Sequence, residues 1–254
     1  MLKIAMLSGW HVHAKGYAEI INSIPETEIA AIWDEDKKRG SNWAQSLDVP
    51  FEPDLDQLLA NDDINGVVVD TPTNMHKEVM IKAAEAGKHI FTEKVMALTV
   101  ANCKEIEKTV REAGVKFCIS FPHRTRPDIL FAKEAVEEGL LGDITSLRIR
   151  NAHNGSIADW LPSHFYDPEE CGGGAMMDLG AHGMYLARWF LGEPKKITSI
   201  FNNVTDRKVE DNATSVIEFE NNAIAINETG FVSTNDPFFF FFFFFYFSFF
   251  FFCP

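Results

Sequence analysis

The feature that most constrains the fold is a regular alternation of short apolar runs and helix-like segments along the first 120 residues. Five apolar runs are typical of buried strands and occupy residues 3–7, 28–33, 66–69, 88–92 and 116–120. Four segments between them have the apolar spacing of amphipathic helices and occupy residues 14–23, 36–47, 74–86 and 100–113. Strands that alternate with helices form βαβ units, and these units build a parallel sheet. The sequence therefore predicts an α/β domain over residues 1–122, a doubly wound parallel sheet of the Rossmann type.

The pattern changes after Pro122. A helix is expected at 126–138, and the run DITSLRIRN at 143–151 alternates like a strand with one exposed face. A long irregular loop, 152–174, then leads to a helix at 176–191. Three more strand-like runs occupy residues 196–203, 213–220 and 223–229. Residues 123–237 are therefore predicted to form a second, α+β domain with a mostly antiparallel and incomplete sheet, which would bind substrate and mediate oligomerisation.

The C-terminal residues 238–254 differ from the rest of the chain. From Phe238 to Phe252 every residue is phenylalanine except Tyr246 and Ser248. The run is shorter than the roughly 20 residues of a spanning helix, and it lacks the alternation of a strand with one wet face. We interpret it as an artefact of the gene sequence, such as a thymine-rich frameshifted read, and exclude it from the expected fold. A hydrophobic anchor is the alternative.

Charge and cysteine usage narrow the class of protein. The formal net charge of −14 argues against nucleic acid or an anionic membrane as the main partner. The four cysteines have no paired spacing, so no secreted disulfide framework is indicated. Because Met1 leads at once into an apolar strand, we expect no signal peptide and a cytoplasmic protein.

The turn after the first strand is the expected place for a dinucleotide's phosphates. It reads Ser8-Gly9-Trp10-His11, with one glycine where the usual fingerprint has three. His11 and His13 stand where a cofactor would pass, although both could simply fill the turn. Asp34 ends the second strand, where a ribose-binding acid is expected, and the alternative that it is only a turn residue stays open. A carboxylate favours NAD, but Lys37, Lys38 and Arg39 keep NADP possible.

Two further strand ends contribute candidates for the same site. The segment after the third strand supplies Thr71, Pro72, Asn74 and His76, either as contacts to the nicotinamide-side ribose or as ordinary turn residues. The run at 88–92 delivers Glu93 and Lys94 to its carboxyl end. In open α/β sheets, ligands bind at the carboxyl ends of the strands. These residues are therefore predicted to lie at one cofactor-binding edge.

The glycine-rich segment CGGGAMMDLGAH, 171–182, is the second chemical feature. Asp178 and His182 are four residues apart and so share one face of a helix. Together with Lys94 they form a plausible set for proton transfer. The pair could instead be a helix-surface hydrogen bond, or half of a metal site completed by His153, His164 or Cys171. Because the spacing is not that of a zinc motif, we predict no metal.

A pocket for a hydroxyl-rich ligand is a further hypothesis. Aromatic side chains and fixed hydrogen-bond donors are the groups that bind polyols. Residues of these kinds after Pro122 include Arg124, Trp160, His164 and Tyr166. Their assignment to substrate binding rests on sequence position alone.

Three segments in combination resemble the Gfo/Idh/MocA family of NAD(P)-dependent oxidoreductases, which includes enzymes like inositol dehydrogenase and glucose–fructose oxidoreductase. They are VVVDTPTNMH, AAEAGKHIFTEKV and GGGAMMDLGAH, and the resemblance spans residues 3–229. It implies hydride transfer, in an interdomain cleft, between a nicotinamide and a carbinol carbon of a sugar or cyclitol. By the same resemblance His182 is the general base, Lys94 binds the reacting oxygen, and Asp178 orients substrate or imidazole.

The chain departs from the family pattern in ways that weaken these expectations. The glycine turn is degenerate, and Val95 replaces the proline of the family's E-K-P motif. Because a cis bond to a residue other than proline costs about 2.5–4 kcal/mol, we predict a trans Lys94–Val95 bond. Family members also extend well beyond this length; a full-length protein would be a homodimer or tetramer. The alternative function is a non-catalytic nucleotide- or sugar-binding protein that retains the fold.

Overall fold

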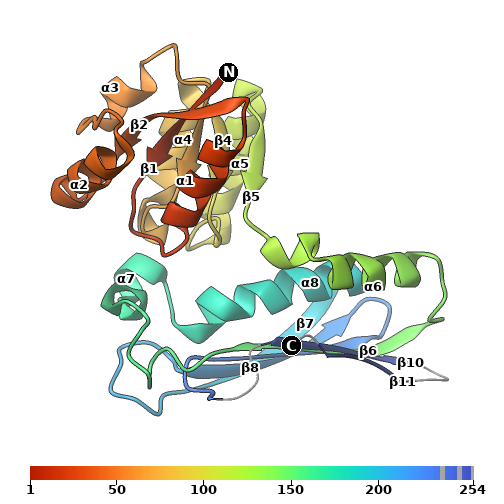
Figure 1. Ribbon diagram of the computed structural model, residues 1–254. Coiled ribbons are helices and arrows are strands. Elements are labelled where there is room, and N and C mark those ends of the chain that lie inside the picture. The colour runs from red at the N-terminus through yellow and green to blue at the C-terminus, as the bar shows by residue number, and fades with distance from the viewer. Residues whose placement is uncertain (235–237, 245–247, 253–254) are drawn as a thin grey trace. The chain divides into compact units, whose positions relative to one another are not determined.

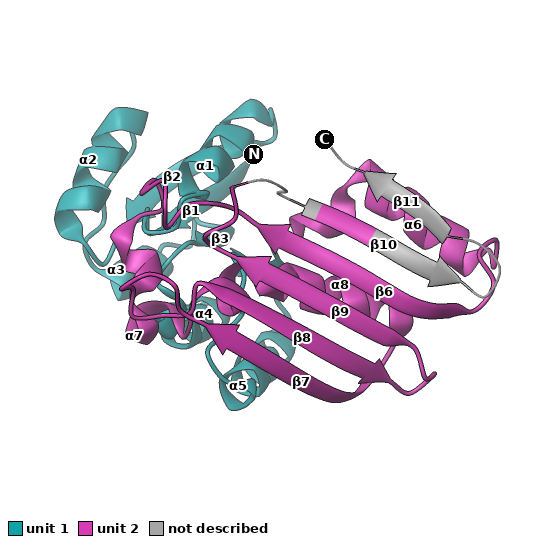
Figure 2. Cartoon of the chain, turned by 90° about the horizontal axis from the view of Figure 1, so that it is seen from below, with its two compact units in different colours: residues 1–120 teal, residues 121–254 magenta. Residues whose placement is uncertain are grey.

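The computed structural model describes residues 1–234, 238–244 and 248–252. Its contacts divide the chain into two compact units, residues 1–120 and 121–254, which Figure 2 colours teal and magenta. The first unit holds a parallel sheet and the second a mostly antiparallel sheet, so the predicted fold class is confirmed.

Unit 1 is built on a five-stranded sheet in the order β2-β1-β3-β4-β5 (Figure 1). The strands are β1 Leu2–Leu7, β2 Thr27–Trp33, β3 Gly66–Val69, β4 His89–Thr92 and β5 Phe117–Ile119. All neighbouring pairs are parallel. Strand β1 lies between β2 and β3, so the chain reverses its direction of winding there, and such a switch point is where doubly wound folds bind ligands.

Helices pack on both faces of this sheet. They are α1 Ala14–Ser23, α2 Lys37–Leu47, α3 Leu55–Leu59, α4 His76–Glu85 and α5 Val100–Ala113. Successive residues of β1 point to opposite faces: Leu7 joins a core with α4 and α5, whereas Met6 joins a core with α1 and α2. Both faces are therefore apolar, which explains why the strands read as continuous hydrophobic runs.

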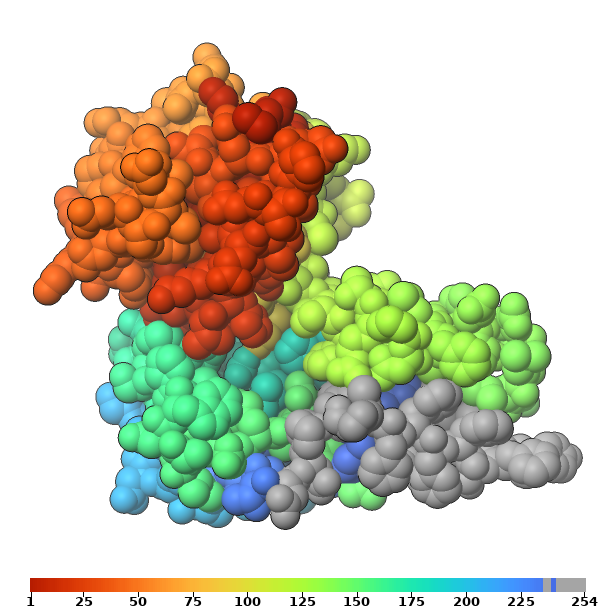
Figure 3. All heavy atoms as spheres, in the orientation of Figure 1, coloured from red at the N-terminus to blue at the C-terminus, as the bar shows by residue number. Residues whose placement is uncertain are grey.

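Helix α2 is fixed against the end of β2. It begins at the N-cap Asp36, whose carboxylate accepts hydrogen bonds from the Lys38 and Arg39 backbone N–H groups. A Cβ on Gly40 would lie 2.4 Å from Cβ of Asp34 and 2.5 Å from the Phe51 ring, so only glycine allows this approach. The outer, polar side of α2 lies on the surface of unit 1 (orange in Figure 3).

Unit 2 contains a six-stranded sheet in the order β11-β10-β6-β9-β8-β7 (Figure 2). The strands are β6 Ile144–Ala152, β7 Pro194–Asn202, β8 Asn212–Phe219, β9 Ile224–Gly230, β10 Phe238–Phe244 and β11 Ser248–Phe252. Strands β6 and β9 pair in parallel, and the other pairs are antiparallel. The sheet is therefore mostly antiparallel, as predicted.

The helices of unit 2 cover one face of its sheet. They are α6 Pro127–Glu137, the short α7 Pro168–Cys171 and α8 Ala181–Leu191. Ile129 of α6 and Leu186 of α8 share a core with Leu147 and Ile149 of β6. The loop predicted as irregular holds two short elements, the 3₁₀ turn Ser163–Tyr166 and α7. Across the residues that the structure describes, no helix has the length and apolarity of a membrane span.

The phenylalanine run has a place in the fold, and excluding it was wrong. Residues Phe238–Phe244 form β10, which pairs antiparallel with β6. Phe240 is buried, and its ring centroid lies 4.9 Å from that of Phe190. A uniform apolar run needs no alternation, because it offers a phenylalanine to the core in any register. Residues 235–237, 245–247 and 253–254 lie outside the described part, and the gene-level origin of the run stays a hypothesis.

Candidate functional site

Buried polar side chains mark the carboxyl edge of the parallel sheet in unit 1. One follows each strand in turn: Ser8, Asp34, Asp70, Glu93 and Ser120. A buried polar group costs free energy unless it is paired, so a row of them at one edge indicates a built site. This is the edge at which α/β proteins of this topology bind ligands.

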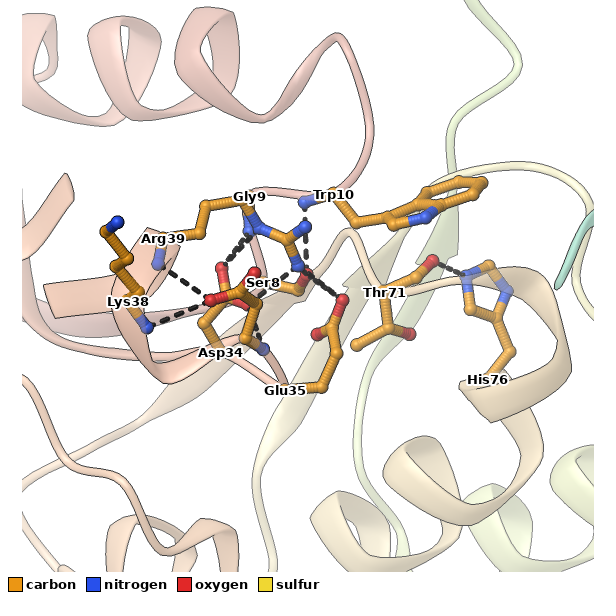
Figure 4. Close-up of polar contacts among 10 residues, drawn as sticks. Ser8, Gly9, Trp10, Asp34, Glu35, Lys38, Arg39, Thr71 and His76 are labelled. Carbon is orange, nitrogen blue, oxygen red and sulfur yellow. Dashed lines mark hydrogen bonds and ion pairs between the residues drawn. The ribbon is translucent and has the colours of Figure 1, made fainter. Parts of the chain in front are cut away.

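The turn after β1 replaces the missing glycines with a serine in an unusual conformation (Figure 4). Ser8 has φ 79°, in the left-handed region that glycine favours. Its hydroxyl oxygen accepts a hydrogen bond from the Trp10 N–H at 3.0 Å, and the hydroxyl donates to Glu35 at 3.0 Å. A Cβ on Gly9 would lie 3.2 Å from the Trp43 ring. The turn therefore keeps the sharp reversal that the sequence pattern made doubtful.

Asp34 is fully engaged with its surroundings (Figure 4). Its Oδ2 accepts hydrogen bonds from the Gly9 N–H at 2.9 Å and from Arg39 Nε at 2.9 Å. Its Oδ1 accepts from the Asp36 N–H at 2.8 Å and from Arg39 Nη2 at 2.7 Å. Asp34 thus holds the turn in place, which was the alternative interpretation. Its role toward a ribose stays a prediction.

Glu35 is a candidate that sequence reasoning missed. Its Oε1 accepts hydrogen bonds from Ser8 and from the Arg39 guanidinium (Figure 4). Its Oε2 is buried and has no hydrogen-bond partner among the described residues. Burial raises the pKa of Glu35, against the opposing hydrogen bond from Ser8. The only signal in the sequence was a second acid directly after Asp34.

The segment after β3 is tied to the segment after β4 by His76. The buried His76 ring has Nδ1 2.8 Å from the Val95 carbonyl oxygen and Nε2 3.1 Å from the Thr71 carbonyl oxygen. Burial lowers the pKa of His76, so the neutral ring donates to one of these two carbonyls. His76 therefore links two backbone turns. The Thr71 hydroxyl oxygen is buried without a partner in the described chain, Pro72 is also buried, and Asn74 is exposed.

The peptide bond between Lys94 and Val95 is cis, so the predicted trans bond was wrong. The prediction weighed the intrinsic cost of the bond alone. It left out the tertiary contacts of this segment, which include the His76 ring on the Val95 carbonyl and the Lys94 N–H donating to Glu93 at 2.9 Å.

Glu93 is the centre of a buried polar network. His13 Nδ1 lies 2.8 Å from its Oε1, the Tyr17 hydroxyl donates to the same oxygen, and that hydroxyl lies 2.8 Å from Ser120 Oγ. Burial by itself raises the pKa of Glu93, but the His13 hydrogen bond and the nearby His11 and Lys94 outweigh it. The pKa of Glu93 consequently lies well below its usual range. Burial and the Glu93 charge raise the pKa of Tyr17.

Asp70 is a second carboxyl group that the sequence did not single out. It is fully buried, and neither carboxylate oxygen has a hydrogen-bond partner within the described residues. Burial, and then the charge of Glu93, raise its pKa well above the usual value for aspartate. Burial therefore favours the neutral, protonated form of Asp70 over the carboxylate.

In unit 2, Asp178 and His182 flank the point at which a π-helical segment continues as an α-helix. Asp178 lies in the π-helical segment Met176–Gly180, and His182 lies in the first turn of α8. Short π-helical segments are frequent at functional sites. His182 is buried, and its Nδ1 lies 2.9 Å from the hydroxyl oxygen of Tyr185. The ring of His123 is 4.6 Å away, centroid to centroid. Tyr185 and His123 were both missed; Tyr185 lies three residues after His182 on α8, a spacing that could have marked it, whereas His123 lies in a separate segment.

The glycine run before this helix is explained by packing. A Cβ on Gly174 would lie 2.2 Å from the backbone carbonyl oxygen of Glu210. The N–H groups of Gly174 and Met176 donate to the Glu210 carboxylate at 2.8 and 2.9 Å. These contacts fix the start of the helix that carries His182.

The four predicted substrate residues occupy different environments. Arg124 is exposed and its guanidinium lies 4.5 Å from the Trp189 ring centroid. Trp160 is exposed and its ring lies 4.6 Å from that of His153. His164 is half-buried, whereas Tyr166 is buried in a core cluster with its hydroxyl oxygen accepting from Ser156 at 3.1 Å. Tyr166 therefore stabilises the loop, and the shared pocket stays a prediction.

Unit 1 has the doubly wound parallel sheet of the nucleotide-binding α/β class. A family model described as "Oxidoreductase family, NAD-binding Rossmann fold" matches residues 8–121. A model of the GFO/IDH/MocA C-terminal domain matches residues 129–243. The chain belongs to the GFO/IDH/MocA family.

Named relatives agree with this assignment. The chain is 30% identical over 233 residues to 2,7-anhydro-N-acetylneuraminate hydratase of Mediterraneibacter gnavus, covering 87% of this chain and 61% of that protein. It is 29% identical over 222 residues to scyllo-inositol 2-dehydrogenase (NAD(+)) of Bacillus subtilis, covering 84% and 61%. The chain thus spans about three fifths of the length of these relatives. The crystal structure of GenD2 from gentamicin A biosynthesis, in complex with NAD, shares the fold with a TM-score of 0.90 at 24% identity, covering 97% of this chain and 71% of that one.

Proposed function

We propose that this protein is an NAD-dependent oxidoreductase that moves a hydride between the nicotinamide and a hydroxyl-bearing carbon of a sugar, cyclitol or related polyol. The observation that carries the proposal is the row of buried polar side chains at the carboxyl edge of unit 1, where Lys94 follows Glu93. Family membership and the buried His182 of unit 2 support it.

The residues of unit 1 fit a dinucleotide. Two buried acceptors lack a partner among the described residues, Glu35 Oε2 and Thr71 Oγ1, and ribose hydroxyl groups can donate to both. The left-handed Ser8 and the adjacent Gly9 shape the turn after β1, where a pyrophosphate would lie, and the Gly9 and Trp10 N–H groups are held by Asp34 and Ser8. Asp34 and Glu35 favour NAD over NADP, because both carboxylates repel a 2′-phosphate. Arg39 is already paired with both acids, so its charge is not available to a 2′-phosphate.

The chemistry assigned to the protein is proton transfer. The bound nicotinamide would accept the hydride. We assign His182 as the general base that takes the hydroxyl proton at Nε2. The Nδ1–H then donates to the Tyr185 oxygen at 2.9 Å, which fixes the tautomer and the ring orientation. Lys94 would stabilise charge on the same substrate oxygen, and Asp178 would orient substrate or imidazole.

A non-catalytic nucleotide- or sugar-binding protein is the second candidate. Trp10 and His11 in the phosphate turn and Val95 after Lys94 favour it. We further propose that the full-length protein is a cytoplasmic dimer or tetramer. The edge strand β7 exposes Ile197, Ile200 and Phe201, and exposed apolar side chains favour association.

The test is an assay with NAD⁺ and a panel of cyclitols, aldoses and anhydro sugars. We expect reduced nicotinamide to accumulate with at least one cyclitol or sugar, and more slowly with NADP⁺. Because one relative is named a hydratase, substrate consumption should also be followed by mass spectrometry, with water addition as a separate readout. Saturable cofactor binding without conversion of any substrate would contradict the proposal and support the binding protein.

A further inference from the structure

Two histidines and a glutamate form a cluster that the proposed hydride transfer does not use. His11 and His13 lie in the turn after β1, and Glu93 follows β4. Their candidate ligand atoms all lie within 4.8 Å of one another. His13 Nδ1 is 2.8 Å and His11 Nδ1 is 3.9 Å from the same atom, Glu93 Oε1, and the two rings are 4.7 Å apart between centroids.

The spacing of these atoms fits one transition-metal ion. Zinc binds imidazole nitrogen and carboxylate oxygen at about 2.0–2.2 Å, which in a tetrahedron separates two ligand atoms by roughly 3.3 Å. The two nitrogen–oxygen distances, 2.8 and 3.9 Å, lie on either side of that value. Each of these two distances therefore differs by about half an ångström from the tetrahedral value, and the two imidazole nitrogens lie within 4.8 Å of each other.

Hydrogen bonds from neighbouring groups orient His11 and Glu93. His11 Nδ1 accepts a hydrogen bond from the His13 backbone N–H at 3.3 Å, so a bound ion would replace this N–H on the nitrogen's lone pair. Glu93 is oriented by the Lys94 N–H on Oε2 and by the Tyr17 hydroxyl on Oε1. Such outer contacts are what keep metal ligands aligned. The His13 side chain is 52% exposed, which gives an ion a path from solvent.

We propose that His11, His13 and Glu93 bind a divalent transition-metal ion, with Zn²⁺ as the best-matched ion. Two imidazoles and one carboxylate suit Zn²⁺, Co²⁺ or Fe²⁺, whereas Mg²⁺ and Ca²⁺ prefer sets made only of oxygen. Three protein ligands leave one position open, as in zinc sites that bind water or a substrate oxygen. The site lies within unit 1, at the strand ends proposed for the cofactor, and its metal binding can be measured without cofactor. This site differs from the sequence-based expectation of no metal, and from the alternative set of Asp178 and His182 with His153, His164 or Cys171.

The test uses the complete 254-residue chain stripped of metal with a chelator. Co²⁺ is titrated as a spectroscopic probe, and Zn²⁺ is then titrated by calorimetry and by displacement of Co²⁺. We expect one ion per chain, visible absorption bands typical of four-coordinate Co²⁺, and no competition from Mg²⁺. His13→Ala and Glu93→Gln should each weaken binding by about 100-fold.

Two matched histidine variants make the result specific. His89→Ala removes an exposed histidine elsewhere in unit 1, and His164→Ala removes one of unit 2; both should bind the ion as the unaltered chain does. Because His13 is half exposed, His13→Ala is expected to fold, and circular dichroism checks this. Absence of stoichiometric binding, or binding that survives in His13→Ala and is lost in His164→Ala, would overturn the proposal.

Discussion

Replacing Lys94 or His182 by alanine is expected to lower turnover by about 100- to 10,000-fold, the usual contribution of a positioned acid–base group. Affinity for NADH should change little. His182 is assigned to the proton of the substrate hydroxyl, and Lys94 to the charge on the same oxygen, so both act on the reacting atom. His182 is held through Tyr185 at 2.9 Å, and its loss leaves that hydroxyl without this partner.

Steady-state kinetics on the best substrate of the panel, combined with NADH titrations, separate these effects. Lys104→Ala and His89→Ala are the controls, since Lys104 lies exposed on α5 and His89 lies exposed on β4. Both controls should keep wild-type turnover. A parallel loss of NADH affinity and turnover in Lys94→Ala or His182→Ala would show that the residue holds the cofactor, and the assigned role would be wrong.

Replacing Asp70 by asparagine is expected to make the protein more stable relative to wild type as the pH rises. Burial, and then the Glu93 charge, raise the folded-state pKa of Asp70 well above the value of about 3.9 in an unfolded chain. Protonation of Asp70 therefore makes its full contribution to the free energy of unfolding below about pH 3.9. This contribution is lost as the pH rises toward the folded-state pKa. Within that window the free energy of unfolding of wild type should fall by about 1.4 kcal/mol per pH unit relative to Asp70→Asn.

Urea unfolding at a series of pH values between 4 and 8 measures this difference. The buried amide of the asparagine lowers the free energy of unfolding by an amount that does not depend on pH. The diagnostic quantity is therefore the slope, against pH, of the difference in free energy of unfolding between Asp70→Asn and wild type. Asp62→Asn, at an exposed position of unit 1, is the control and should give no slope. A flat difference between Asp70→Asn and wild type would mean that Asp70 is not held neutral in the folded protein.

The fold of unit 1 could be predicted from the sequence because the same strand–helix pattern occurs several times in succession. Each strand of unit 1 is a continuous apolar run and each helix has one apolar face, so four successive βαβ units agree on one architecture. The prediction failed for Phe238–Phe244, where the run has no periodicity and its partner, β6, lies far away in the chain. It also failed for the Lys94–Val95 bond, because intrinsic peptide energies contain no tertiary contacts.

The candidate site was predictable only in part, for a similar reason. Asp34, Glu93 and Lys94 could be identified because each follows a predicted strand. In a parallel sheet, the residues that follow the strands gather at the carboxyl edge, where ligands bind. The contacts among them were not predictable. Tyr17 of α1 meets Glu93 after β4, and no local pattern marks this contact. Tyr185 lies three residues after His182 on α8, a spacing that could have marked it.

The central claim is that unit 1 binds NAD although its phosphate turn has one glycine. Titration of the folded chain with NADH, followed by nicotinamide fluorescence and by calorimetry, tests it most directly. The account predicts one saturable site per chain, weakening in Asp34→Ala and about tenfold weaker binding of NADPH. No saturable binding of NADH to a folded chain, or tighter binding of NADPH, would contradict it.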